Sequence, residues 1–201
     1  HTKAIDFLAA LDKRFGQLVE LHAIVGFVAD HGMKDKCAAD GSYNIVYLQD
    51  HLDERFGTGT TRVICPITDA FVGHHGALGG FVRVHCFDGV EARDAIDFIR
   101  PIEGIEDVLE RQEASTQFDL PFDVEADVVV ISSENYCVGM GRDDHDLTEL
   151  HGERLRSHGG LSERDVPFVL SRPLNDRYLA RPRSEQLCNY HIFDFAMNGT
   201  V

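Results

Sequence analysis

Asp30 and His31 place a carboxylate next to an imidazole, directly after an apolar run over residues 23–29. The run is typical of a buried strand, and open α/β sheets carry their chemistry at the carboxyl ends of such strands. Successive strand side chains point to opposite faces, so both groups reach one metal ion only if the chain turns, which Gly32 permits. Oxygen and imidazole ligands together suit zinc. The pair predicts a zinc site, and an ordinary Asp-His-Gly turn is the alternative for the tripeptide alone.

Two further histidines could join this site. His158 lies between small residues, in the segment 156–160, shortly before a second apolar run at 166–170. His1 opens the chain ahead of an amphipathic helix. The alternative for His158 is a loop histidine that two following glycines permit, and for His1 it is a chain end with a freely moving ring.

Other polar groups have weaker patterns. His74 and His75 lie in a glycine-containing loop, where His75 could face a substrate as a hydrogen-bond donor or both could pack beneath the site. The run Asp143–Asp146 has metal-ligand residue types, but no strand precedes it to fix them. We expect a solvated acidic loop there, continuing to His151.

Lys34 and Lys36 follow the Asp-His pair closely. Both could be solvated surface charges, or they could add positive charge to the rim of an anion site.

The elements that must position these groups alternate between helical and extended patterns. This alternation predicts an α/β architecture, with a mainly parallel sheet flanked by helices. Helices are expected over residues 5–21, 44–56, 91–99, 105–111 and 188–196. Strands are expected over residues 24–29, 62–67, 81–87, 127–131 and 166–170. Residues 172–183, with two prolines, are expected to form a surface loop.

Several segments resemble, in order, the phosphonoacetate hydrolases of the alkaline phosphatase superfamily. They cover residues 29–33, 44–50, 66–69, 74–79, 128–132, 155–160 and 189–195. The resemblance implies an alkaline-phosphatase-like α/β fold that hydrolyses the C–P bond of phosphonoacetate to acetate and phosphate, with zinc. It also implies that residues 1–201 are the C-terminal portion of a single metallohydrolase domain, incomplete at the N-terminus.

The resemblance also implies a ligand set for two zinc ions that flank a threonine nucleophile. Asp30 and His31 match the pair that holds one ion, together with an early aspartate and the threonine. His158 matches the late histidine that holds the other ion, and His1 matches the last residue of an Asp-x-x-x-His motif. The threonine and the other aspartates are expected upstream of His1. The chain alone is therefore expected to be inactive.

The amino-acid composition limits the classes of partner that the chain is expected to bind. A formal net charge of −15 disfavours nucleic acid and anionic membranes, and an anionic phosphonate would need the positive charge that two zinc ions supply. No run approaches the roughly 20 apolar residues of a membrane-spanning helix. Five scattered cysteines are typical of thiols in a reducing compartment. We expect a cytoplasmic enzyme with a small-molecule phosphonate as its partner; the oligomeric state stays open, a homodimer included.

Two other functions remain as alternatives. A phosphodiesterase, nucleotide pyrophosphatase or sulfatase-like enzyme of the same superfamily would share the ligands Asp30, His31 and His158. A non-catalytic metal-binding fragment would keep them without turnover.

Overall fold

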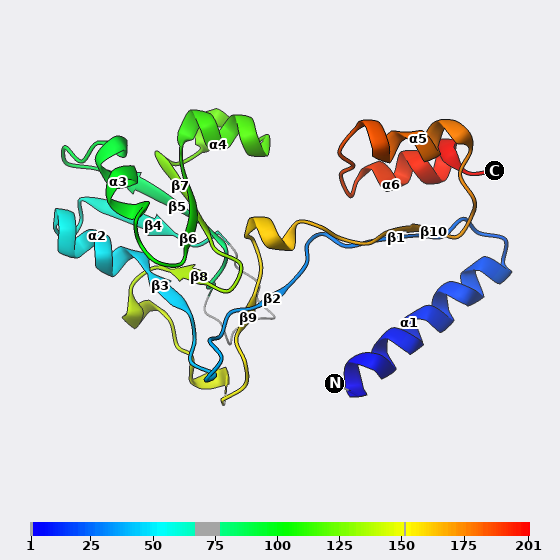
Figure 1. Ribbon diagram of the computed structural model, residues 1–201, viewed down its shortest axis with the longest axis horizontal. Coiled ribbons are helices and arrows are strands. Elements are labelled where there is room, and N and C mark those ends of the chain that lie inside the picture. Colours follow the sequence, from blue (N-terminus) through cyan, green and yellow to red (C-terminus); the bar gives the residue numbers. More distant parts are fainter. Residues whose placement is uncertain (1, 67–76, 151) are drawn as a thin grey trace. The chain divides into compact units, whose positions relative to one another are not determined.

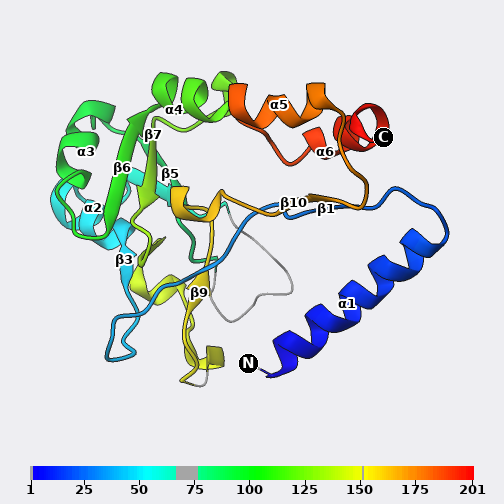
Figure 2. The ribbon, with the colours of Figure 1, turned by 45° about the vertical axis from the view of Figure 1, so that its right-hand side comes forward.

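The computed structural model describes residues 2–66, 77–150 and 152–201, and the chain divides into two compact units (Figures 1 and 2). One unit comprises residues 1–30 and 166–201, and the other comprises residues 31–165. The expectation that all 201 residues belong to a single domain stays a prediction.

The unit of residues 31–165 is built on a four-stranded sheet. Its spatial order is β4 (Thr61–Ile64), β5 (Phe81–Cys86), β7 (Val128–Ser132) and β6 (Ile105–Glu110). Every neighbouring pair in this sheet is antiparallel. The chain is thus an α/β protein, but the expectation of a mainly parallel sheet is wrong for the described strands. The reason lies in β7, which inserts between β5 and β6 and runs against both.

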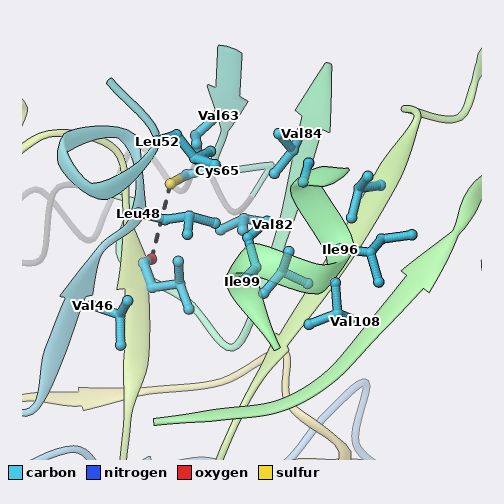
Figure 3. Packing of buried hydrophobic residues seen from close by; sticks show 14 residues of the cluster. Val46, Leu48, Leu52, Val63, Cys65, Val82, Val84, Ile96, Ile99 and Val108 are labelled. Carbon is cyan, nitrogen blue, oxygen red and sulfur yellow. Dashed lines mark hydrogen bonds between the residues drawn. The ribbon is translucent and has the colours of Figure 1, made fainter. Parts of the chain in front are cut away.

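Helices cover both faces of this sheet. On one face, α2 (Leu48–Phe56) and α3 (Ala92–Ile99) pack against the strands around a cluster that includes Val82, Val84 and Val108 (Figure 3). On the other face, α4 (Arg111–Phe118) packs against the alternate residues of the central strand. Because both faces are covered, all five residues of β7 are buried. This explains the continuous apolar run of that strand.

Two short ladders extend the unit. The strand β3 (Ile45–Tyr47) pairs in parallel with β8 (Cys137–Gly139), and β2 (Lys34–Asp35) pairs antiparallel with β9 (Arg156–Ser157). Single turns of 3-10 helix lie at Phe122–Val124, Arg142–Asp144, Thr148–Leu150 and Leu161–Glu163.

Two predicted helices need correction in this unit. Residues 45–47 of the predicted helix 44–56 form β3, and the helix begins at Leu48. Residues 105–110 of the predicted helix 105–111 form the strand β6, and the helix α4 follows it. The register of β6 against β7 shifts between Ile105 and Asp107. A strand irregularity of this kind puts Ile105, Val108 and Leu109 at spacings that imitate a helix.

The other unit contains α1 (Thr2–Glu20), close to the predicted helix 5–21, and the antiparallel pair of β1 (Gly26–Val28) and β10 (Phe168–Leu170). These strands lie inside the predicted strands 24–29 and 166–170. The terminal segment holds α6 (His191–Asp194), which continues into a π-helical turn at Phe195–Gly199.

The predicted surface loop over 172–183 is wrong, because most of it is the helix α5 (Asp176–Ser184). Asn175 caps this helix by accepting a hydrogen bond from the backbone N–H of Tyr178, whose ring packs on Phe195. Pro182 lies two residues before the helix ends, so its missing N–H costs the last turn only.

Among the helices of the described residues, none is both long enough and apolar enough to cross a membrane.

Candidate functional site

The ladder of β2 and β9 brings together two of the histidines singled out from the sequence. Lys34 pairs with Ser157, so the segment that follows His31 runs alongside the segment that precedes His158. The two imidazole rings stack with centroids 3.6 Å apart and an angle of 6° between their planes. The structure therefore places two predicted zinc ligands, far apart in sequence, in direct contact.

A backbone contact selects one tautomer of His31. Its Nδ1 lies 2.8 Å from the carbonyl oxygen of Gly32, which can only accept a hydrogen bond. Nδ1 therefore carries the proton in the neutral ring, and Nε2 carries the lone pair. Metal-binding histidines commonly hold their second ring nitrogen in this way, because the contact fixes both the tautomer and the ring orientation.

The segment carrying His158 is held by residues just before β5. The carbonyl oxygen of His158 accepts a hydrogen bond from the N–H of Gly80 at 2.7 Å, and the hydroxyl of Ser157 donates to the carbonyl of Leu78 at 2.6 Å. A Cβ added to Gly80 would lie 2.2 Å from the backbone nitrogen of Gly160. The two backbones thus approach so closely that only glycine fits at position 80.

Asp30 is the last residue of its unit and is exposed; it is joined by one peptide bond to His31, which is half-buried. His1, a predicted zinc ligand, and His75, a predicted substrate contact, lie outside the described residues. Within residues 2–66, 77–150 and 152–201, no three His, Cys, Asp or Glu side chains come close enough together to hold a metal ion. The described part of the chain therefore supplies a pair of neighbouring histidines and not a full ligand set.

The acidic run 143–146 differs partly from expectation. Asp143, Asp144 and Asp146 are exposed, as a solvated loop requires, but His145 is buried. Its Nε2 accepts a hydrogen bond from the N–H of Met140 at 2.8 Å. This contact gives His145 a structural role that the sequence pattern did not reveal.

The charged groups that follow His31 are paired. Lys34 donates to Glu134 at 2.8 Å, and this hydrogen bond raises the pKa of the lysine and lowers that of the glutamate. A hydrogen bond from Arg154 likewise lowers the pKa of Asp35. Both pairs are substantially exposed and contribute little to stability.

Lys36 is neither a solvated charge nor part of an exposed rim. It is fully buried, and its Nζ lies 2.9 Å from Oε1 of Glu163, which is also buried. The sequence alone does not predict this ion pair, since nothing in the local pattern distinguishes Lys36 from the half-buried Lys34.

Comparison with known proteins adds an independent observation. No family model matches the chain. The crystal structure of phosphonoacetate hydrolase from Sinorhizobium meliloti 1021 in complex with phosphonoformate superposes with a TM-score of 0.86 and 42% sequence identity, over 95% of this chain and 45% of that one. The chain resembles phosphonoacetate hydrolases. It spans slightly less than half of that structure's length.

Two other comparisons agree with this resemblance. The S. meliloti phosphonoacetate hydrolase in complex with phosphonoacetate matches with a TM-score of 0.83 and 40% identity, over 95% of this chain and 45% of that one. A phosphonoacetate hydrolase of Penicillium oxalicum is 60% identical over 30 residues, which are 15% of this chain and 42% of that sequence.

The same fold also occurs in a more distant enzyme. Murine ectonucleotide pyrophosphatase/phosphodiesterase 5 matches with a TM-score of 0.54 and 16% identity, over 82% of this chain and 40% of that one. At this identity the likeness concerns the fold alone.

Proposed function

We propose that this chain is the C-terminal part of a zinc-dependent phosphonoacetate hydrolase of the alkaline phosphatase superfamily. The reaction is hydrolysis of the C–P bond of phosphonoacetate to acetate and phosphate. The observation that carries the proposal is the stacking of His31 on His158, in a chain 42% identical to a phosphonoacetate hydrolase over nearly all its residues.

The donor set of these residues fits zinc. His31 and His158 offer imidazole nitrogens, and Asp30 adds a carboxylate next to His31; these are ligand types that zinc takes. Hydrogen bonding of the His31 Nδ1 to Gly32 leaves Nε2 with the lone pair that a metal ion needs. We propose that Asp30 and His31 hold one zinc ion, and that His158, with His1, holds the other.

Bound zinc would lower the pKa of an attacking hydroxyl group and would stabilise negative charge on the phosphonate oxygens. The residues of this chain have a positioning part in that chemistry. Gly32 keeps the proton on Nδ1 of His31, and Gly80 holds the backbone of His158. We propose that the threonine nucleophile and the remaining ligands belong to the portion of the enzyme that these residues do not span, and that residues 1–201 alone are inactive.

The partners follow from the same proposal. The substrate is a small anionic phosphonate, and no part is assigned to nucleic acid or to a membrane. We propose a cytoplasmic location, in agreement with the single scattered cysteines, none of which is disulfide-bonded.

A substrate panel tests this function. The product of the complete reading frame that encodes this chain is purified with zinc, and phosphate or acid release is measured with phosphonoacetate, a nucleotide phosphodiester and a sulfate ester. Phosphate release from phosphonoacetate at a kcat/KM well above the other two is expected. Preference for the nucleotide diester or the sulfate ester would assign the enzyme to another branch of the superfamily, and loss of all activity despite bound zinc would favour a non-catalytic metal-binding protein.

A further inference from the structure

The buried ion pair between Lys36 and Glu163 joins the two segments that carry His31 and His158. Both side chains are almost completely inaccessible, with 0% and 1% of their surfaces exposed, and Nζ lies 2.9 Å from Oε1. Nζ also donates to the backbone carbonyl of Glu134 at 2.7 Å. Burying two charges costs desolvation free energy that an apolar pair of similar volume would not. The hydrogen bonds of the pair indicate a role besides stability.

Glu163 contacts the backbone beside both histidines. Its Oε2 accepts the N–H of Gly160 at 2.8 Å, close after His158, and its backbone carbonyl accepts the N–H of Gly32 at 2.6 Å, directly after His31. The hydroxyl of Ser162 donates to Oε1 at 2.6 Å. One residue therefore bonds the backbone beside both histidines.

Lys36 connects Glu163 to the segment that carries His31. It follows β2 directly, on the segment that carries His31, and its backbone N–H donates to the carbonyl of Leu155 at 2.9 Å, next to β9. The ion pair thus links the segment of His31 to the segment of His158 through side chains, in parallel with the short backbone ladder. That ladder has only two residues in each strand, so the ion pair adds a second link to a short backbone pairing.

We propose that Lys36 and Glu163 are positioning residues that hold His31 against His158 in the orientation required for zinc binding. The proposal rests on the proposed function, because it assigns a role to a site whose ligands are these histidines. It differs from a role in stability alone, because the Glu163 side chain bonds the backbone of Gly160 and fixes the residue whose backbone carbonyl accepts the N–H of Gly32.

The test separates positioning from stability. Lys36→Met/Glu163→Gln removes both charges together and leaves no unpaired buried ion, and Glu163→Asp keeps the charge but is too short to reach Lys36 and Gly160 at once. The control is Arg83→Met/Glu125→Gln, which removes a different, partly buried ion pair, with contacts of 2.6 and 2.9 Å, between β5 and the segment before β7. Thermal unfolding and zinc affinity, by competition with a chromophoric chelator, are measured for each complete gene product.

Both variants of the Lys36–Glu163 pair should bind zinc about 10- to 100-fold more weakly, as expected when the groups that orient metal ligands are lost. The control should lose stability and keep the parent's zinc affinity. Parental zinc affinity in folded Glu163→Asp or in the folded double variant would overturn the proposal. An equal loss of zinc affinity in the control would also overturn the proposal.

A second measurement needs no metal and therefore separates this inference from the proposed function. Long-range ¹H–¹⁵N NMR of the metal-free protein reports the tautomer of His31, and the parent should show a single Nδ1–H form. Glu163→Asp should show mixed tautomers. If the parent fails to bind zinc but Glu163→Asp still changes the His31 signals, the zinc assignment fails and the positioning role stands; unchanged signals in Glu163→Asp would remove the positioning role.

Discussion

The imidazole rings of His31 and His158 lie parallel, with their centroids 3.6 Å apart. Each histidine is followed directly by a glycine, and each segment is fixed through its backbone: Gly32 to Glu163, and His158 to Gly80. We propose that each of these histidines holds one of two zinc ions, the assignment that the resemblance to phosphonoacetate hydrolases implies.

Gly80→Ala should displace the segment that carries His158, although Gly80 is not itself a proposed zinc ligand. The new Cβ would lie 2.2 Å from the nitrogen of Gly160 and 2.7 Å from its Cα, and a backbone atom cannot rotate away as a side chain can. We expect a loss of roughly 1–3 kcal/mol in the free energy of unfolding, as for other overpacked positions. Chemical denaturation measures this loss, and zinc affinity should fall with it.

Gly16→Ala is the matched control for this substitution. Gly16 lies within α1, and a methyl group added there would have no atom of the described residues within 4 Å, its own helix backbone aside. This change should raise the stability by about 0.5–1 kcal/mol, because alanine favours helix. Equal effects of the two substitutions would contradict the close approach of Gly80 to Gly160.

Asp194 should make the terminal helices sensitive to acid. Its carboxylate accepts hydrogen bonds from Asn198, Arg181 and Tyr178, which lower its pKa to about 2. A carboxyl group whose pKa is depressed by folding stabilises the folded state above its unfolded pKa, and this contribution is lost as the pH falls toward 2. Asp194→Asn should therefore lower Tm at pH 7 and have little effect near pH 2. A Tm difference that is constant between pH 7 and pH 2 would contradict this network.

The cysteines should differ in reactivity. Burial raises the pKa of Cys137 to about 12 and that of Cys65 and Cys86 to about 11, while Cys188 is exposed. Since the thiolate is the reactive form, iodoacetamide at pH 8 should modify Cys188 well before the three others in the folded protein. Peptide mass spectrometry over time measures the order. Modification of Cys137 at the rate of Cys188 would show that the core around β8 opens readily.

The sequence predicted the parts of the fold in which local pattern and burial agree. The strand over residues 81–87 alternates as a strand should, and the helix over 91–99 has one apolar face; both appear within one residue of their predicted bounds. The strand β6 was mistaken for a helix because its register shift changes the apolar spacing. The antiparallel sheet was missed because strand order depends on long-range pairing that no local pattern records.

In the candidate site, too, some residues could be predicted from the sequence and others could not. Asp30, His31 and His158 were singled out from strand ends, glycines and family resemblance, and the structure joins the two histidines. The ion pair of Lys36 and Glu163 was not foreseen, because lysine is usually exposed and its partner lies far along the chain. His145 was assigned to a solvated loop with its acidic neighbours, yet its contact with Met140 buries it.

The zinc content of histidine variants tests the central claim most directly. Elemental analysis of the purified complete gene product should give two zinc ions per chain, and His31→Ala and His158→Ala should each lose zinc together with nearly all phosphate release from phosphonoacetate. The matched control, His145→Ala, removes a buried histidine that bonds Met140, so it should lose stability and keep its zinc. Full zinc content in both His31→Ala and His158→Ala would contradict the account.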